Sequence, residues 1–207
     1  MKTAIIPARL SSTRLPGKLM LKDTGRTLIS YAIESALAAK VTTVIVASDS
    51  DEILEEAATL GATPHKLQKE HTNGTSRVLE ASESLDSEHD VIINFQAKEP
   101  QMRPEDLTRL SEGLRFRQSW QWVTFSAPLT EDERHMRSVV KVAVSTIGDA
   151  LYFSRAPLAG ALKHVGVYAF KRLIMPKLKD IPDSYLAMKE NLEQLTWVDF
   201  GWKGGVV

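Results

Sequence analysis

Three cationic side chains lie close together near the start of the chain, within residues 7–18, which read PARLSSTRLPGK. These side chains are Arg9, Arg14 and Lys18, and they alternate with small hydroxyl residues and one glycine. Arginine offers a planar fork of N–H donors and lysine a compact charge, so together they suit phosphate oxygens. The stretch matches neither the P-loop motif nor the dinucleotide-binding glycine motif. On chemistry alone, a phosphate site and a solvated basic loop both remain open.

A second polar cluster, residues 94–100 with the sequence NFQAKEP, follows the apolar run at 91–93. That run is typical of a buried strand, and ligands of open α/β sheets bind beyond the carboxyl ends of the strands. Gln96 and Lys98 therefore fall where a ligand is expected. Lys98 either works in a phosphate site or marks a site that has lost its metal.

Alternating strands and helices are predicted to position these two clusters. In the first half, short apolar runs predict strands at 3–7, 43–48, 62–65 and 90–95, and amphipathic patterns predict helices at 27–40, 49–60, 75–85 and 104–117. Such an alternation is typical of βαβ units and a mostly parallel sheet. In the second half, strands are expected at 122–127, 139–145, 151–154, 165–170 and 196–202, with a helix at 185–195. We expect a single α/β domain over residues 1–207, with a mixed or antiparallel second half.

The composition fits such a domain and excludes some classes of protein. The 207 residues are 43% hydrophobic and 25% charged, and 26 basic residues balance 26 acidic ones. A net charge of zero argues against a general nucleic-acid surface but allows a local anion site. The chain has no cysteine, which excludes disulfides and thiolate metal sites. No stretch predicts a signal peptide or membrane insertion, so we expect a cytoplasmic protein.

The string P-A-R-x-x-S-T-R-L-P-G-K resembles the signature loop of sugar-nucleotide cytidylyltransferases, and above all the 3-deoxy-manno-octulosonate cytidylyltransferase family. Six more segments resemble motifs of that family in the same order: VASD at 46–49, HTNGTSR at 71–77, NFQAKEP at 94–100, VVKV at 139–142 with ALYFSRA at 150–156, HVGVY at 164–168 and ENLEQL at 190–195. These matches span nearly the whole chain. The resemblance implies a nucleotide-diphospho-sugar transferase-like fold, with a nucleotide-binding half at 1–120 and a sugar-binding, sheet-extending half at 121–207.

The resemblance also implies a reaction and its partners. A cytidylyltransferase of this family joins CTP to a sugar acid and releases pyrophosphate, a step in lipopolysaccharide precursor synthesis. The resemblance implies that the nucleotide site comprises Ala8, Arg9, Lys18, Asn73, Gly74 and Arg77. It also allows a homodimer. From the residues themselves, Arg77 could instead be an exposed helix charge, and Asn73-Gly74 could be a simple turn.

For the sugar acid, the resemblance implies a second set of residues: Arg14, Gln96, Arg155, His164, Tyr168, Glu190 and Gln194. The donor fork of Arg155 suits a carboxylate. His164 and Tyr168 are four apart in a predicted strand and should share one face. Glu190 and Gln194, four apart in a predicted helix, should also share one face. A packed core tyrosine, a surface histidine and an exposed helix face are the simpler alternatives.

The family pattern implies a magnesium cofactor whose ligands are missing here. In that pattern position 98 is an aspartate that binds Mg²⁺, and a later V-D-T-P segment supplies a second aspartate. This chain has Lys98 and no V-D-T-P, and Ser76 stands where the pattern is acidic. A hard divalent cation usually needs one or two protein carboxylates. We therefore expect no metal-binding residue in this chain.

Two hypotheses follow from Lys98. In the first, its ammonium takes over part of the metal's electrostatic work, and Lys98 joins Arg9 and Lys18 as a catalytic residue. In the second, catalysis is lost and the chain is a ligand- or partner-binding relative. Because residues 73–77 match the family pattern only in part, another sugar or base is a third alternative.

Overall fold

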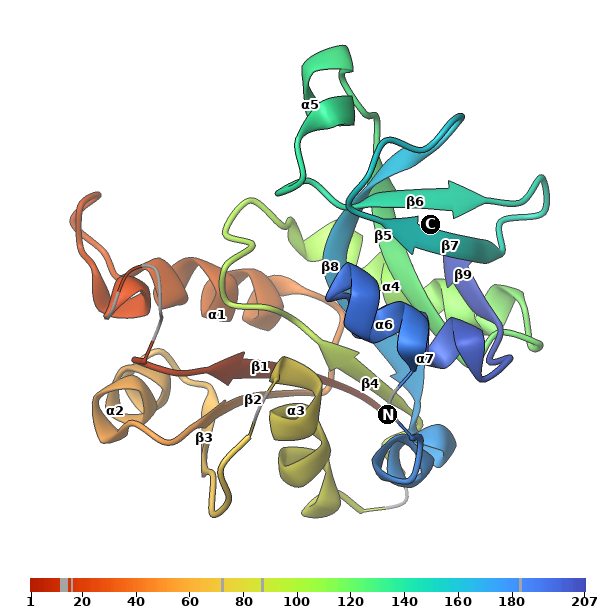
Figure 1. Ribbon diagram of the computed structural model, residues 1–207. Coiled ribbons are helices and arrows are strands. Elements are labelled where there is room, and N and C mark those ends of the chain that lie inside the picture. The colour runs from red at the N-terminus through yellow and green to blue at the C-terminus, as the bar shows by residue number, and fades with distance from the viewer. Residues whose placement is uncertain (12–14, 16, 72, 87, 183) are drawn as a thin grey trace.

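The computed structural model of the chain describes residues 1–11, 15, 17–71, 73–86, 88–182 and 184–207. In these residues one sheet runs through the molecule (Figure 1). Its strands are β1 Lys2–Ala8, β2 Thr43–Ser48, β3 Thr63–Lys66, β4 Val91–Asn94, β5 Trp122–Ala127, β6 Lys141–Val144, β7 Ala150–Ser154, β8 Leu162–Lys171 and β9 Gly204–Val206. The described helices are η1 Lys18–Met20, α1 Leu28–Ala38, α2 Asp51–Thr59, α3 Gly74–Glu83, α4 Pro104–Phe116, α5 Glu131–His135, η2 Arg172–Lys179, α6 Tyr185–Glu190 and α7 Gln194–Asp199.

The first half of the sheet is parallel, as predicted. The strand order is β3-β2-β1-β4-β8-β5-β9, and β1 pairs in parallel with both β2 and β4. The chain leaves β1 toward β2 and β3 and then crosses back to place β4 on the other side of β1. This reversal makes the β1/β4 junction the topological switch point, where open α/β sheets bind ligands.

The second half extends the same sheet with mixed pairing, which confirms the predicted fold class. β8 runs antiparallel to both β4 and β5, and β9 is parallel to β5. β6 pairs antiparallel with β7 and with the start of β8. β8 thus connects the parallel half to the extension, because its first residues pair with β6 and its later residues pair with β4 (Figure 1).

Helices cover both faces of the sheet because alternate strand residues point to opposite sides. Ile6 belongs to a core shared with α1, α2 and α4, whereas its neighbour Ile5 belongs to a core shared with α3, η2 and α7. The first core is largely aliphatic. The second contains Trp122 and Trp197, whose rings are 5.2 Å apart. The β1/β4 switch point therefore rests on packed layers on both sides.

The predictions for residues 185–202 were wrong in part. One helix and one strand were expected, but α6 and α7 are separate helices and the last strand is β9. Asn191 ends α6 in the left-handed conformation, with φ of 52°, which asparagine tolerates better than most residues. Trp197 in α7 packs edge-on against Tyr168 and Phe170. That packing favours a helix where the apolar alternation predicted a strand.

Two other features of the described helices bear on the predictions. The short helices α5, η1 and η2 were not predicted, because short helices carry little periodicity. Within the described part of the chain, no helix has the length and apolar character needed to cross a membrane.

Candidate active site

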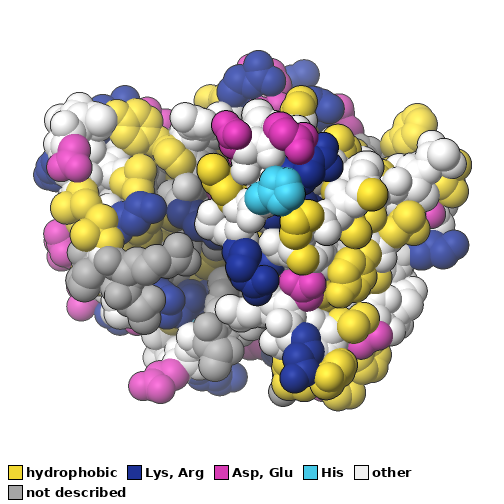
Figure 2. Space-filling view, turned by 45° about the horizontal axis from the view of Figure 1, so that its top comes forward, with side chains coloured by type: hydrophobic (Ala, Val, Ile, Leu, Met, Phe, Trp, Pro, Cys, Tyr) yellow, Lys and Arg dark blue, Asp and Glu magenta, His cyan; other side chains and the backbone are white. Residues whose placement is uncertain are grey.

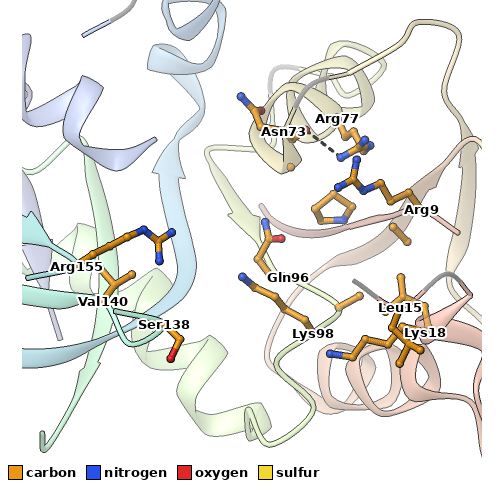
Figure 3. A pocket seen from close by; sticks show the side chains of 15 residues that line it. Arg9, Leu15, Lys18, Asn73, Arg77, Gln96, Lys98, Ser138, Val140 and Arg155 are labelled. Atoms are coloured by element: carbon orange, nitrogen blue, oxygen red, sulfur yellow. Dashed lines mark hydrogen bonds between the residues drawn. The ribbon is translucent and has the colours of Figure 1, made fainter. Parts of the chain in front are cut away.

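A cavity of about 610 Å³ opens at the carboxyl ends of β1 and β4 (Figures 2 and 3). Figure 2 shows lysine and arginine side chains gathered around a hollow on this face. The cationic residues that line the cavity are Arg9, Lys18, Arg77, Lys98 and Arg155. None of the described residues that line it is acidic. A cavity with this lining attracts anions.

The first loop brings Arg9 and Lys18 to the same cavity although they are nine residues apart. Arg9 follows the buried end of β1 at Ala8, and Lys18 begins η1. The loop folds back because the Gly17 N–H donates to the Leu10 carbonyl, at 2.9 Å, with Gly17 at a φ of 69° that glycine adopts readily. Ala8, which was predicted in the nucleotide site, also lines the cavity. The predicted sugar-binding residue Arg14 lies outside the described residues.

The start of α3 carries the other nucleotide-site candidates. The Asn73 side chain caps the helix by accepting from the Ser76 N–H at 2.8 Å, so the segment is more than a simple turn. Arg77 is only 8% exposed, and its guanidinium donates to the carbonyls of Asn73 and His71. The alternative of an exposed helix charge is therefore wrong for Arg77.

Arg9 and Arg77 place like charges side by side, as Figure 3 shows. Burial lowers the pKa of Arg77, the charge of Arg9 lowers it further, and Asp49 opposes both effects. Two guanidinium groups held near each other repel until an anion lies between them. This end of the cavity is therefore arranged for a negatively charged ligand.

Gly74 allows the Gln96 amide to approach the start of α3. A Cβ atom at position 74 would lie 2.7 Å from Gln96 Nε2, closer than van der Waals contact permits. Gln96 in turn donates from Nε2 to Asn94 Oδ1 at 2.8 Å. Gly74 and Gln96 both line the cavity, so the absence of a side chain at position 74 sets the position of the amide.

This contact predicts the effect of Gly74→Ala. The methyl group should displace the Gln96 amide and raise KM for a substrate several-fold, while the Tm changes little because alanine suits a helix better than glycine. Steady-state kinetics and a melting curve measure the two effects. In a Gln96→Ala background the same change should have almost no further effect on KM. A KM increase as large in that background would show that the Gln96 contact is not the cause.

A second cavity of about 380 Å³ adjoins the first. The two cavities share Gly74, Gln96, Lys98, Ser138, Val140 and Arg155 among their lining residues. The second is also lined by three predicted sugar-site residues, His164, Tyr168 and Gln194. The structure thus places residues of the predicted nucleotide site and residues of the predicted sugar site in adjoining cavities. Lys98 and Gln96 lie at the boundary between them.

Arg155 is held in place by backbone carbonyl groups. Its Nε donates to Glu190 O at 3.0 Å, and its two terminal nitrogens donate to Arg137 O and Asn191 O, each at 3.2 Å. Figure 3 shows its guanidinium pointing toward the first cavity from the side opposite Lys18. The arginine is therefore oriented before any ligand binds.

Glu190 and Gln194 do not share a helix face, contrary to the prediction. Glu190 ends α6 and Gln194 begins α7, because the left-handed Asn191 separates the two helices. The Glu190 carboxylate accepts from Ser154 Oγ at 2.9 Å and from the Arg155 N–H at 2.8 Å, and Glu190 does not line either cavity. Its contacts hold the segment that carries Arg155.

His164 and Tyr168 do lie together, as predicted. Their ring centroids are 5.5 Å apart, and both line the second cavity. The Thr124 hydroxyl donates to the Val167 carbonyl at 2.8 Å, so it can accept from His164 Nε2 at 3.0 Å. Burial, helped by the charge of Lys98, lowers the pKa of His164 to about 3, so the imidazole is neutral. Burial raises the pKa of Tyr168, which therefore keeps its O–H.

Sequence reasoning missed Glu193, which lies in the same ENLEQL segment as Glu190. A chain of hydrogen bonds reaches it from the first cavity: Gln96 to Asn94, Asn94 Nδ2 to Thr75 Oγ1 at 3.1 Å, and Thr75 to Glu193. Burial raises the pKa of Glu193 to about 7, although the bond from Thr75 opposes that rise. The sequence carries no signal that distinguishes Glu193 from Glu190. Which of the two lines the second cavity depends on the break between α6 and α7.

The raised pKa of Glu193 predicts a pH-dependent stability. The folded-state pKa of about 7 lies above the ordinary value of 4.5, so the folded protein binds the extra proton and its stability should fall as pH rises from about 4.5 to 7. Glu193→Gln removes the ionisation and should raise the free energy of unfolding at pH 8 by ~3 kcal/mol, with little change near pH 4.5. Melting curves at both pH values measure this. Glu112→Gln, an exposed change on α4, is the matched control, and a pH-independent shift for Glu193→Gln would contradict the assignment.

The residues present do not fit the magnesium ion that the family pattern implies. Among the described residues, no group of three or more histidine, aspartate or glutamate side chains could hold a metal ion. Residues 1–22, which include the whole first loop, contain no acidic residue. Next to Lys98, the strand does not continue to Glu99, because the Glu99 N–H donates to Gln96 O and closes a turn. Glu99 lines only the second cavity, and burial raises its pKa.

Comparison with known proteins shows which family this chain resembles. A model of the family described as cytidylyltransferase matches residues 3–203. The 3-deoxy-manno-octulosonate cytidylyltransferase of Escherichia coli is 35% identical over 206 residues, covering 95% of this chain and 83% of that protein. The enzyme of that name from Lawsonia intracellularis is 38% identical over 202 residues, covering 92% of this chain and 79% of that protein.

A solved structure agrees with these two relatives. CMP:2-keto-3-deoxy-manno-octonic acid synthetase, complexed with CTP, superimposes with a TM-score of 0.94 at 34% identity. The match covers 100% of this chain and 89% of that one. The chain therefore belongs to the cytidylyltransferase family, among the 3-deoxy-manno-octulosonate cytidylyltransferases.

Proposed function

We propose that this chain transfers CMP from CTP to a sugar acid like 3-deoxy-manno-octulosonate and releases pyrophosphate. The observation that carries the proposal is the pair of adjoining cavities at the β1/β4 switch point, one lined by cations without an acid among its described residues and one lined by polar groups together with basic and acidic side chains. The relatives act on this sugar acid by name, and a solved relative holds CTP. The product would be a precursor for lipopolysaccharide synthesis.

In the proposed reaction, a hydroxyl oxygen of the sugar acid forms a bond to the α-phosphorus of CTP. The bond from that phosphorus to the oxygen bridging the α- and β-phosphates breaks, and the bridging oxygen leaves with the electron pair in pyrophosphate. The hydroxyl proton passes to water. The protein's part is to align the two substrates and to offset negative charge on the phosphates.

The first cavity supplies the proposed nucleotide site. Arg9 and Lys18 would hold the triphosphate, with the backbone near Ala8 seating the nucleotide. Asn73, Gly74 and Arg77 would lie beside the base and ribose. The nucleotide residues all belong to residues 1–120, which we propose as the nucleotide-binding half.

The second cavity supplies the proposed sugar site. Arg155 has N–H groups beyond its three carbonyl contacts and would bind the carboxylate of the sugar acid. Neutral His164 and Tyr168, together with Gln96 and Gln194, would bind hydroxyl groups. We propose Glu193 in place of Glu190 as the acidic residue of this site. Most of these residues come from 121–207, the proposed sugar-binding half.

The test is pyrophosphate release from CTP and 3-deoxy-manno-octulosonate at millimolar concentrations. We expect release only when both are present, together with a rise in Tm on adding CTP alone. Neither release nor a CTP-dependent Tm shift would overturn the proposal. Parallel assays with ATP, GTP, UTP and other sugar acids test the alternative of a different base or sugar.

The other expected alternative, a relative without catalytic activity, has less support. Lys98 motivates it, but Gln96 and Arg155, which line both cavities, are held in place by hydrogen bonds to Asn94 and to the Glu190 carbonyl. CTP binding without turnover would favour it.

The proposal places the chain in the cytoplasm, where CTP is made. Sedimentation would test the predicted homodimer.

A further inference from the structure

Lys98 lies at the boundary between the two proposed substrate sites. It lines both cavities, together with Gln96 and Arg155. β4 ends at Asn94, and the turn closed by the Glu99 N–H and Gln96 O, at 3.0 Å, projects the exposed Lys98 side chain outward. In Figure 3 its ammonium points into the space between Arg155 and Lys18. A phosphate transferred between the two sites would pass this ammonium.

The charges around Lys98 disfavour a divalent cation at this boundary. The described lining of the first cavity has five cationic side chains and no carboxylate to offset them. Burial raises the pKa of Glu99, the neighbouring acid, and the charges of Lys98, Lys163 and Lys18 oppose that rise. A hard divalent cation entering here would meet an ammonium instead of the oxygen ligands it requires.

Lysine and a divalent cation hold a triphosphate differently. The ammonium is a fixed point charge with three N–H donors, and it binds phosphate oxygens without any added ion. A triphosphate already chelated by Mg²⁺ carries two fewer negative charges and brings a cation toward Lys98. The cavity is therefore better matched to the free nucleotide than to its magnesium complex.

We infer that this chain binds the metal-free form of its nucleoside triphosphate, with Lys98 as the fixed cation at the boundary of the two sites. The inference rests on the proposed function and adds the form of the nucleotide that the site takes. Wild-type protein needs no divalent cation to bind CTP, and excess Mg²⁺ weakens the binding.

Calorimetric titration with CTP tests this, in excess chelator and in millimolar Mg²⁺, on the wild type and three variants. Lys98→Asp restores a carboxylate, and Lys98→Met removes the charge but keeps much of the side chain. Lys177→Asp makes the same charge change at an exposed position in η2 that lines none of the described cavities. Melting curves confirm that each variant is folded, which is expected because Lys98 is exposed.

We expect the wild-type affinity for CTP to be higher in chelator than in Mg²⁺. Lys98→Met should lose about tenfold in chelator, the usual effect of losing one charged hydrogen bond. Lys98→Asp should lose more than that in chelator and recover affinity when Mg²⁺ is added, while Lys177→Asp should behave as the wild type.

Three results would overturn the inference. Wild-type affinity for CTP that is no higher in chelator than in Mg²⁺ would show that the site does not prefer the metal-free nucleotide. Lys98 variants that match Lys177→Asp would remove Lys98 from the site. No binding of CTP in either buffer would overturn the proposed function together with the inference, so failure of the inference alone remains distinguishable.

Discussion

Replacing Arg9 by alanine will lower kcat/KM for CTP by about a hundredfold to a thousandfold. The expected size is that of removing one preorganised donor from developing charge in a transition state. Arg9 lies at the end of β1 in the cationic cavity, beside Arg77. Initial rates of pyrophosphate release at several CTP concentrations measure the change.

The same substitution should leave the ligand-free protein as stable as the wild type, or slightly more so. Arg9 is exposed, and its charge lowers the pKa of Arg77 by repulsion. Removing Arg9 therefore relieves an unfavourable interaction in the empty cavity. A fall in Tm of several degrees would show that Arg9 is structural and that the loss of activity has another cause.

Two further variants complete this experiment. Arg9→Lys keeps the charge but loses the donor fork, so it should recover only part of the lost kcat/KM. Arg115→Ala, on the exposed face of α4, is the matched control and should change neither quantity. Full activity in Arg9→Ala would place the triphosphate elsewhere.

The largest stability effect is expected from Lys141→Met. Lys141 is fully buried, and its ammonium donates to the carbonyls of Met136, Val139 and Arg155 at 2.7, 2.9 and 3.1 Å. Methionine fills much of the same volume but leaves the carbonyls of Val139 and Arg155 without a donor, while the Met136 carbonyl still accepts from the Val139 N–H at 3.2 Å. The free energy of unfolding should fall by ~3 kcal/mol, since each buried unsatisfied acceptor costs about 1–3 kcal/mol. In a chain of this size the Tm should fall by about 6–12 °C.

Lys141 also ties the segment around Ser138 to Arg155, which lines both cavities. Protein that remains folded should therefore show a higher KM for the sugar acid, with a smaller change in the KM for CTP. Lys40→Met, an exposed change after α1, is the control for replacing a lysine. A Tm change no larger than that of the control would mean that water replaces the ammonium in this position.

Much of the fold was predictable because it depends on local patterns. The β-branched runs at β1, β2 and β4 and the amphipathic stretches at α1 and α4 each encode their element within a dozen residues. The predicted parallel half follows from their alternation. The predictions failed at 185–202, where α6 and α7 are too short to show a helical period and where the contact of Trp197 with Trp122 favours the helix.

The candidate site was predictable only where its residues belong to continuous motifs. The stretch at 7–18 and the cluster at 94–100 both favour a ligand site, because cationic and amide side chains follow apolar strands there. The position of a motif does not say which of its side chains faces the ligand. Glu190 and Glu193 belong to one motif. The Glu190 carboxylate accepts a hydrogen bond from the Arg155 backbone N–H, whereas Glu193 lines the second cavity.

By itself, the amino-acid sequence determined the order of the elements, the cationic first loop and the presence of lysine at position 98, since each depends on residues that are neighbours in the chain. The tertiary structure alone decided that Lys98 and Arg155 line the same two cavities, that Arg77 is buried against two carbonyls, and that Glu193 is held by Thr75. The physical reason is that strand pairing and helix packing bring together side chains that are far apart in the sequence. The separation of two residues along the chain does not determine the distance between them in space.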